Sequence, residues 1–391
     1  MPSTRPTLGR LATAGLSALT LLALAACSTG GSGAAGSGGA ATAGSSGPIT
    51  VSATDTECTL SAATAAAGTL TFAVSNKGTK VNEFYVYAAG DRIVGEVENI
   101  TPGLSRELKI EVTEPGTLTT ACKPGMVGDG IRAAFAVTGT AAPGKTDEKV
   151  ATAISAYTTY VGQQADALVA QTGQFVAAVK AGDVATAKAL YPKARLPWER
   201  IEPVAASFGD LDPKVDGRED VVAEGMAFTG YHRLEKDLWV DGLQADSGAM
   251  ADQLLADVTT VAAEAKKVQL TGLAIASGAK ALLDEVATGK VTGEEERYSH
   301  TDLWDFQGNV EGSAAALDAL KPVIQARQPE LQTALDTTYQ ALWSALTAHR
   351  GATGDYVAYT ALTPDQVKAL SVALDAFSEQ VARVPAVVAT P

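Results

Sequence analysis

The chain has 391 residues, enough for two or three hydrophobic cores, because domains mostly run to about 100 to 200 residues. Its 44 acidic residues outnumber its 30 basic ones and give a formal net charge of −14. Such a surface makes nucleic acid and anionic lipid poor partners, so cations or basic proteins suit it better.

Residues 1 to 26 have the pattern of a signal peptide, since Arg5 and Arg10 precede an apolar run that lasts to Ala26. The run ends in Leu-Ala-Ala-Cys, which resembles a bacterial lipobox and implies cleavage before Cys27 and a diacylglycerol on its sulfur. An ordinary exported protein with a coincidental cysteine is the alternative. No comparable apolar run follows, so we expect an extracytoplasmic protein held at the cell membrane by lipid and otherwise water-soluble.

Residues 27 to 48 consist almost entirely of Gly, Ala, Ser and Thr after the first cysteine. They cannot bury enough apolar surface to fold, which predicts a flexible leash. With Cys27 lipidated, Cys58 and Cys122 are the two remaining cysteines, and an oxidising compartment favours a disulfide between them.

Residues 49 to 140 alternate between apolar and polar positions in short runs separated by turn residues. The clearest runs are 69–74, 82–87, 107–112, 117–121 and 131–137. Runs of this length and spacing predict a β-sandwich.

The segment is similar to a cupredoxin domain, with an early strand carrying Cys58, a hairpin, a Pro-Gly turn and a Thr-Ala-Cys run that ends at Cys122. A blue-copper site needs two histidines and a cysteine, but the first histidine of the chain is His232, which excludes such a site here. If the cysteines stay reduced, they could form a sulfur-rich metal site with Glu83 and Met126. The alternative is the structural disulfide, which we expect.

Residues 141 to 145 indicate a linker, and from 146 to 391 alanine-rich stretches repeat apolar residues at helical spacing. The predicted helices cover 148–181, 183–208, 218–241, 248–270, 272–289 and, in pieces interrupted by Pro322 and Pro329, the region from 299 onward. The last helix opens at Thr363 and Pro364. The pattern predicts an all-α antiparallel bundle of more than four helices.

Several acidic and histidine side chains in this region have the spacing of metal ligands. His232 and Glu235 lie three residues apart, so one helix face would present both to the same ion. Glu199 and Glu202 repeat that spacing, and residues 211 to 216 (LDPKVD) are predicted as a loop ending near the helix of His232. Residues 298 to 312 are dense in polar, aromatic and acidic side chains. Bundles commonly build metal sites from such residues on facing helices.

Each of these signals also has an ordinary structural explanation. A histidine three residues before a glutamate can be satisfied by it, and a glutamate pair at this spacing is usually a solvated face. Asp212 and Asp216 could be turn and cap residues, and His300 could cap its helix. His349, beside Arg350 at a helix end, is interpreted as structural.

The combination of motifs nevertheless resembles a known family. Residues 191–203, 207–212, 230–236 and 298–306 closely resemble the imelysin-like, peptidase-related domain of the EfeO family, and the cupredoxin-like segment and lipobox extend the likeness over the mature chain. The resemblance implies the lipid-anchored or periplasmic component of an elemental iron-uptake system. It implies as partners an iron permease and a haem-containing peroxidase.

The resemblance also implies a set of metal ligands in the bundle. They would be Glu199, Glu202, His232 and Glu235, with Asp216, Asp305 and Glu311 as second candidates. Carboxylates with one imidazole suit ferric or ferrous iron and can also take zinc or copper.

Two other functions are alternatives to iron binding. A zinc peptidase would need a second histidine and a general base next to the first pair, but Arg233 follows His232 and Lys236 follows Glu235. A redox module would oxidise ferrous iron at the cupredoxin-like domain before transfer. We therefore expect a binding protein rather than an enzyme.

Overall fold

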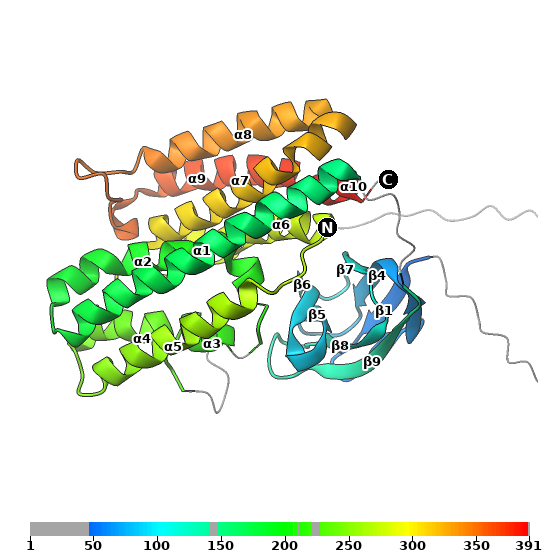
Figure 1. Ribbon diagram of the computed structural model, residues 1–391, viewed down its shortest axis with the longest axis horizontal. Helices are drawn as coiled ribbons and strands as arrows, with labels where there is room; N and C mark the ends of the chain where they lie inside the picture. Colours follow the sequence, from blue (N-terminus) through cyan, green and yellow to red (C-terminus); the bar gives the residue numbers. More distant parts are fainter. Residues whose placement is uncertain (1–46, 141–146, 206, 210, 220–226, 390–391) are drawn as a thin grey trace, which may run out of the picture. The chain divides into compact units, whose positions relative to one another are not determined.

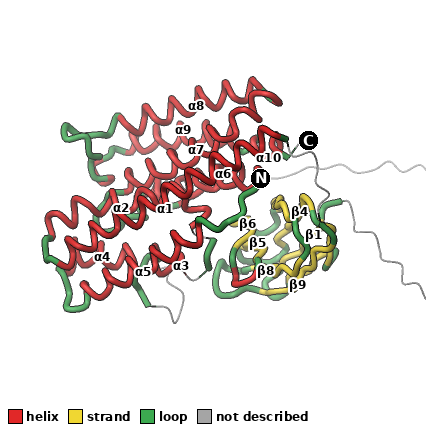
Figure 2. The backbone as a smooth tube through the Cα atoms, in the orientation of Figure 1, coloured by secondary structure: helices red, strands yellow, loops and turns green. Residues whose placement is uncertain are grey.

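A computed structural model describes residues 47–140, 147–205, 207–209, 211–219 and 227–389 (Figure 1). The N-terminal part of this range is built of strands and the C-terminal part of helices, as predicted (Figure 2). The predicted signal peptide, Cys27, most of the leash and the predicted linker lie outside the described residues. Within the described ranges no helix combines the length and apolar character needed to cross a bilayer.

The strands form two sheets, which confirms the predicted sandwich. The four-stranded sheet has the order β2 (Cys58–Leu60), β1 (Ile49–Ala53), β4 (Gly68–Asn76) and β7 (Ser105–Val112). The five-stranded sheet has the order β3 (Thr64–Ala66), β9 (Ile131–Thr138), β8 (Gly116–Cys122), β5 (Asn82–Tyr87) and β6 (Ile93–Ile100). The pairs β1–β4 and β3–β9 are parallel, and the other pairs are antiparallel.

Strand β6 is not among the runs predicted from alternation. Its sequence, IVGEVENI, breaks the alternation at Gly95, and a Cβ atom there would overlap the side chain of Ile110. Close packing between β6 and β7 therefore requires a glycine at this position. As a result, the sequence lacks an apolar residue where the alternation of a strand would place one.

The sandwich core contains Phe72, Phe84 and Phe135, whose rings pack in tilted and edge-on pairs 5.3 and 5.4 Å apart. Cys58 on β2 and Cys122 on β8 form a disulfide with an S–S distance of 2.01 Å, so a covalent bond joins the two sheets. This disulfide confirms the structural role that we expected for the two cysteines. It occupies both sulfurs that a sulfur-rich metal site would need.

The helical part is the predicted bundle, with its long helices side by side (Figure 1). The helices are α1 (Glu148–Lys180), α2 (Val184–Ala205), α3 (Leu211–Asp216), α4 (Gly230–Lys236), α5 (Ser247–Ala265), α6 (Gly272–Thr288), α7 (Asp302–Arg327), α8 (Pro329–Thr347), α9 (Pro364–Val381) and α10 (Val384–Val388). Short turns add η3 (Lys290–Thr292) before α7, and a π-helical turn, Asp237–Asp241, continues α4.

Three predictions about these helices are wrong. Residues 211 to 216 form helix α3 rather than a loop. The helix predicted over 218 to 241 begins only at Gly230 in the described residues. Pro322 lies inside α7 without ending it, because the buried side chains of Leu320, Val323 and Ile324 hold the flanking turns in the core.

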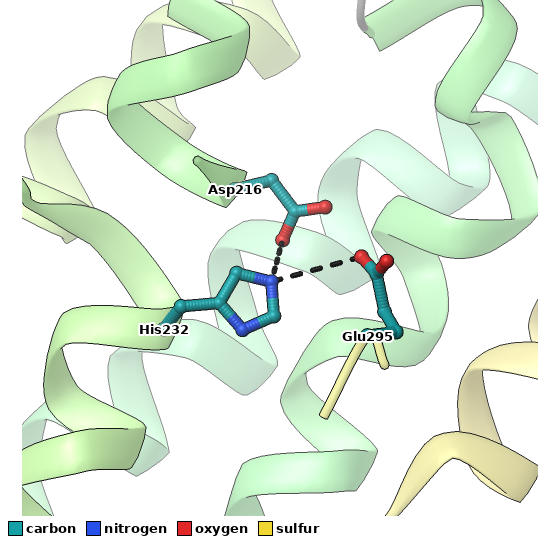
Figure 3. Close-up of side chains that lie close together, drawn as sticks. All are labelled: Asp216, His232 and Glu295. Carbon is teal, nitrogen blue, oxygen red and sulfur yellow. Dashed lines mark ion pairs between the residues drawn. The ribbon is translucent and has the colours of Figure 1, made fainter. Parts of the chain in front are cut away.

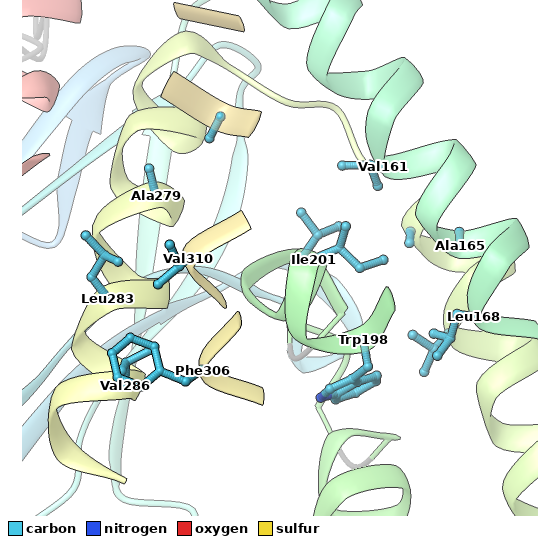
Figure 4. Packing of buried hydrophobic residues seen from close by; sticks show 14 of the residues in the cluster. Val161, Ala165, Leu168, Trp198, Ile201, Ala279, Leu283, Val286, Phe306 and Val310 are labelled. Carbon is cyan, nitrogen blue, oxygen red and sulfur yellow. The ribbon is translucent and has the colours of Figure 1, made fainter. Parts of the chain in front are cut away.

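Helix α2 runs through the middle of the bundle core. Trp198 and Ile201 on α2 are fully buried, with Leu168 of α1 on one side and Phe306 and Val310 of α7 on the other (Figure 4). This central position matters because α2 carries charged residues in the same turns that carry these apolar ones.

Candidate metal centre

A proline opens the hydrogen bonding of α2 at the point where it carries Glu199 and Glu202. Pro203 has no N–H, so the carbonyl of Glu199 has no donor one turn further on, and the backbone departs from helical geometry at Ile201 (φ −124°, ψ 16°). The side-chain amide of Asn309 on α7 donates to that carbonyl at 2.8 Å. The kink is therefore closed by a side chain of the neighbouring helix.

Glycines on α7 let that helix come close enough to α2. A Cβ atom at Gly308 would overlap the Cβ of Glu199, and one at Gly312 would overlap the carbonyl oxygen of Arg200. The two glycines lie four residues apart and so share one face of α7. Asn309 reaches α2 because of this close contact.

A third glycine brings α3 and α4 together. Gly230 has φ +80°, and a Cβ atom there would overlap the carbonyl oxygens of Lys214 and Val215 at the end of α3. Thr229 also donates from its hydroxyl to the carbonyl of Lys214, at 3.0 Å. As a result Asp216, the last residue of α3, faces His232 in the first turn of α4.

The two ring nitrogens of His232 have different surroundings, and Figure 3 shows the nitrogen that faces Asp216 and Glu295. Nδ1 lies 3.1 Å from Glu235 Oε2, a hydrogen bond. Nε2 lies 3.6 Å from Asp216 Oδ1 and 3.7 Å from Glu295 Oε1, both beyond hydrogen-bond distance. This nitrogen is buried and has no hydrogen-bond partner among the described residues.

Glu235 is itself fixed by the main chain. Its Oε1 accepts hydrogen bonds from the N–H groups of Tyr298 at 2.9 Å and Ser299 at 2.6 Å. A histidine whose one nitrogen is held by a carboxylate and whose other nitrogen faces further carboxylates has the arrangement typical of a metal ligand. Atoms bound to one ion lie about 3 to 4 Å apart, close to the separations seen here.

The electrostatics of the cluster favour a positive charge at this point. Burial and Arg195 lower the pKa of His232, but Glu235, Glu295 and Asp216 outweigh them and raise it to about 9. Burial works against ionisation of Glu295, yet Lys290 and His232 hold the pKa of its carboxyl below the usual value. The imidazolium proton therefore occupies the place where a metal ion would be attracted.

Arg195 neutralises much of the remaining negative charge. Its guanidinium is fully buried and contacts Glu199 at 2.7 Å, Glu296 at 2.6 Å and Asp305 at 3.2 Å, and it also pairs with Asp216. Since buried carboxylates are costly when unpaired, this one side chain allows four of them to meet inside the bundle.

Lys290, in the short turn η3, is a second buried cation. Its Nζ lies 2.8 Å from Glu199 Oε2 and 3.1 Å from Glu202 Oε2, and only 1% of the residue is exposed. Asn309 Nδ2 contacts the same two carboxylate oxygens at 3.1 and 3.0 Å. The first glutamate pair of the predicted ligand set is thus occupied by protein groups.

The structure brings together most, but not all, of the predicted ligands. His232, Glu235 and Asp216 lie at one point, and Glu199 and Glu202 connect to it through Arg195 and Lys290. Asp305 pairs with Arg195 but belongs to neither group of side chains that could share an ion. Glu311 lies elsewhere, where it pairs with Arg200 at 2.7 Å.

Sequence reasoning missed four residues of the cluster: Arg195, Lys290, Glu295 and Glu296. Glu295 joins Asp216 and His232 in one potential ligand group, and Glu296 joins His232 and Glu235 in another. The run Glu294-Glu295-Glu296 directly before residues 298 to 312 is the signal that could have been noticed, although such runs are usually solvated.

A small cavity of about 10 Å³ lies against His232, Glu235 and Glu295. That volume is close to what a single water-sized particle needs. The cavity is also lined by Arg218, Arg297 and Tyr298. Its carboxylate oxygens and imidazole nitrogen are donors suited to a hard or borderline cation such as iron.

Comparison with known proteins defines the class. Residues 153–384 match the imelysin family, and residues 17–137 match the cupredoxin-like domain family. The chain therefore joins a cupredoxin-like sandwich to an imelysin-type bundle.

Curated relatives are similar over most of the chain. The iron uptake system component EfeO of Escherichia coli O157:H7 is 36% identical over 344 residues, which cover 86% of this chain and 90% of the relative. The same values hold for the proteins of that name in E. coli K12 and Shigella flexneri. The chain belongs to the EfeO family. A solved structure of reduced auracyanin from Roseiflexus castenholzii matches 25% of this chain and 100% of its own, with 18% identity and a TM-score of 0.21.

Proposed function

We propose that this protein is the extracytoplasmic iron-binding component of an iron-uptake system, anchored by lipid at Cys27. It captures iron in the helical domain and passes it to a membrane permease, in a system that also contains a haem peroxidase. The relatives named as iron uptake components support the assignment to such a system. The signal-peptide and lipobox pattern of the sequence supports the location.

The observation that carries the proposal is the position of Nε2 of His232, buried 3.6 Å from Asp216 and 3.7 Å from Glu295 and within hydrogen-bond distance of neither. A metal ion that replaces the imidazolium proton would bind Nε2 together with both carboxylates. Asp216, His232 and Glu295 would be ligands in this site, and Glu235 would orient the imidazole. Glu199 and Glu202 belong to neither group of side chains that could share an ion, and Lys290 contacts both of them.

The roles of the neighbouring groups support binding rather than catalysis. In a zinc peptidase, a glutamate next to the ligands activates the attacking water. Here Glu235 accepts hydrogen bonds from His232 and from two main-chain N–H groups, so it is committed to holding the ligand. Oxidation of ferrous iron at the sandwich has no support from the cysteines, because they form a disulfide.

The test is an iron titration of the mature protein with ferric citrate and, separately, with ferrous iron under anaerobic conditions. Tryptophan fluorescence is a suitable readout, since Trp198 is buried next to Glu199. We expect His232→Ala to weaken iron binding at least tenfold while the helical circular dichroism stays unchanged. His349→Ala is the matched control, because His349 follows α8 and belongs to neither ligand group. Equal iron affinity of His232→Ala and the wild type would overturn the proposal.

A further inference from the structure

Lys290 lies between two carboxylates of the ligand set that the resemblance implies. Its ammonium contacts one oxygen of Glu199 and one of Glu202 at 2.8 and 3.1 Å, and the residue is 1% exposed. Lysine is rarely buried to this degree unless it is paired. The ammonium offsets one of the two carboxylate charges, and Arg195 pairs with the other oxygen of Glu199.

The same short connection supplies both this ammonium and a proposed ligand. Lys290 lies in the turn η3 directly after α6, and Glu295 follows five residues later, before α7 begins. Glu199 links the two halves of the cluster, since its other oxygen contacts Arg195, which in turn pairs with Asp216 beside His232. Lys290 is therefore connected to Asp216, a proposed ligand beside His232, through Glu199 and Arg195.

We propose that Lys290 is a tethered competitor for the metal, which determines how tightly the site holds its ion. When no metal ion is bound, the ammonium pairs with both Glu199 and Glu202. A metal ion that recruits either carboxylate must first displace the ammonium, so part of the binding free energy is lost. When the ion leaves, Lys290 returns to the carboxylates and no buried negative charge is left unpaired.

The consequence is weaker retention and easier release than the carboxylates alone would give. A protein that hands its ion to another needs this property. The inference rests on the proposed function of iron binding at His232, and it assigns to Lys290 a positioning role rather than contact with the metal. A purely structural role, as a counter-ion for α2, would leave metal affinity unchanged.

The experiment measures the dissociation constant for ferrous iron, titrated anaerobically against a competing chelator, in the wild type and in variants of the mature protein. We expect Lys290→Met to tighten binding at least tenfold and Lys290→Arg to stay within about threefold of the wild type. Lys280→Met is the matched control, because this substitution removes the same unit of charge from α6. Lys280 forms an exposed ion pair with Asp284. Lys290→Gln replaces the methionine variant if that variant does not fold.

A double-mutant cycle then shows whether Lys290 acts through Glu202. Glu202→Gln should change iron affinity by less than threefold in the wild type, where Lys290 holds this carboxylate, and should weaken it at least tenfold in Lys290→Met. Unchanged or weaker binding in Lys290→Met, or an equal effect of Glu202→Gln in both backgrounds, would refute the role of Lys290. Failure of the wild type to bind iron at all would instead refute the proposed function.

Discussion

Asn309 donates a hydrogen bond to the main-chain carbonyl of Glu199 at 2.8 Å and so supplies the donor that Pro203 lacks. The same amide nitrogen contacts the carboxylates of Glu199 and Glu202. One side chain thus closes the kink of α2 and orients both glutamates.

Replacement of Asn309 by alanine should therefore destabilise the bundle. A buried carbonyl and two carboxylates would lose a shared donor, which costs about 2 kcal/mol in the free energy of unfolding. Urea denaturation followed by tryptophan fluorescence measures this. Gln163→Ala is the control, since Gln163 is exposed on α1 and its loss should change stability by less than about 0.5 kcal/mol. Equal stability of the two variants would contradict the bracing role of Asn309.

Substitution of Gly308 by alanine tests the close approach of α7 to α2. The added methyl group would overlap Glu199, so we expect a loss of about 2 kcal/mol from overpacking, together with weaker iron binding. Gly173→Ala on α1 is the control, because no atom lies within 4 Å of a Cβ atom at this position. Helix propensity should stabilise that variant by about 0.5 to 1 kcal/mol. If both variants are stabilised, the helices are not in the contact described.

Removal of the disulfide should affect the sandwich and spare the bundle. Cys58 and Cys122 are 64 residues apart in sequence, and a loop of that length corresponds to about 4 kcal/mol of stabilisation in the chain-entropy account. We expect the double variant Cys58→Ser, Cys122→Ser to lose protection from hydrogen exchange in β5 and β8. Iron binding monitored at the bundle should stay at the wild-type level. A drop in iron stoichiometry would instead support metal binding at the sandwich.

The sandwich should become less stable as pH rises through the range from about 4.5 to 7. Burial, reinforced by Glu98, raises the pKa of Glu83 to about 7, although a hydrogen bond from Tyr85 opposes this. The folded state therefore keeps a proton that the unfolded chain has already released. Stability is highest below pH 4.5, and the loss is complete above pH 7.

Glu83→Gln should remove this dependence. It should stabilise the sandwich at pH 8 by roughly 3 kcal/mol and leave it unchanged at pH 4, as judged by hydrogen exchange of β5 compared with the wild type at each pH. The exposed Glu111→Gln on β7 serves as control. A stabilisation at pH 8 no larger than at pH 4 would show that Glu83 is ionised without cost.

The fold could be predicted from sequence because it depends on periodicity. Alternating runs located β4, β5, β7, β8 and β9, and apolar residues at helical spacing located the long helices. The predictions failed where local spacing and tertiary packing disagree. Strand β6 loses its alternation at Gly95, and α3 is too short to show a helical period.

The candidate site was only partly predictable. His232 and Glu235 lie in the same turn of a helix, so their spacing in sequence predicts their proximity. Lys290 and Arg195 could not be predicted, since a buried cation and a solvated one look alike in sequence. Glu311 shares its helix with Asn309 but points toward Arg200, a difference that depends on the rotation of α7 against α2.

The residues around His232 come from α2, α3, α4 and the connection that leads into α7, so they span more than a hundred positions of the chain. No fragment that ends before Glu295 contains a complete set of donors. During synthesis or export, an extended chain therefore offers incoming metal only scattered carboxylates. Under the proposed function, iron can be loaded only after α2, α3, α4 and the connection before α7 have come together, in whichever compartment that takes place.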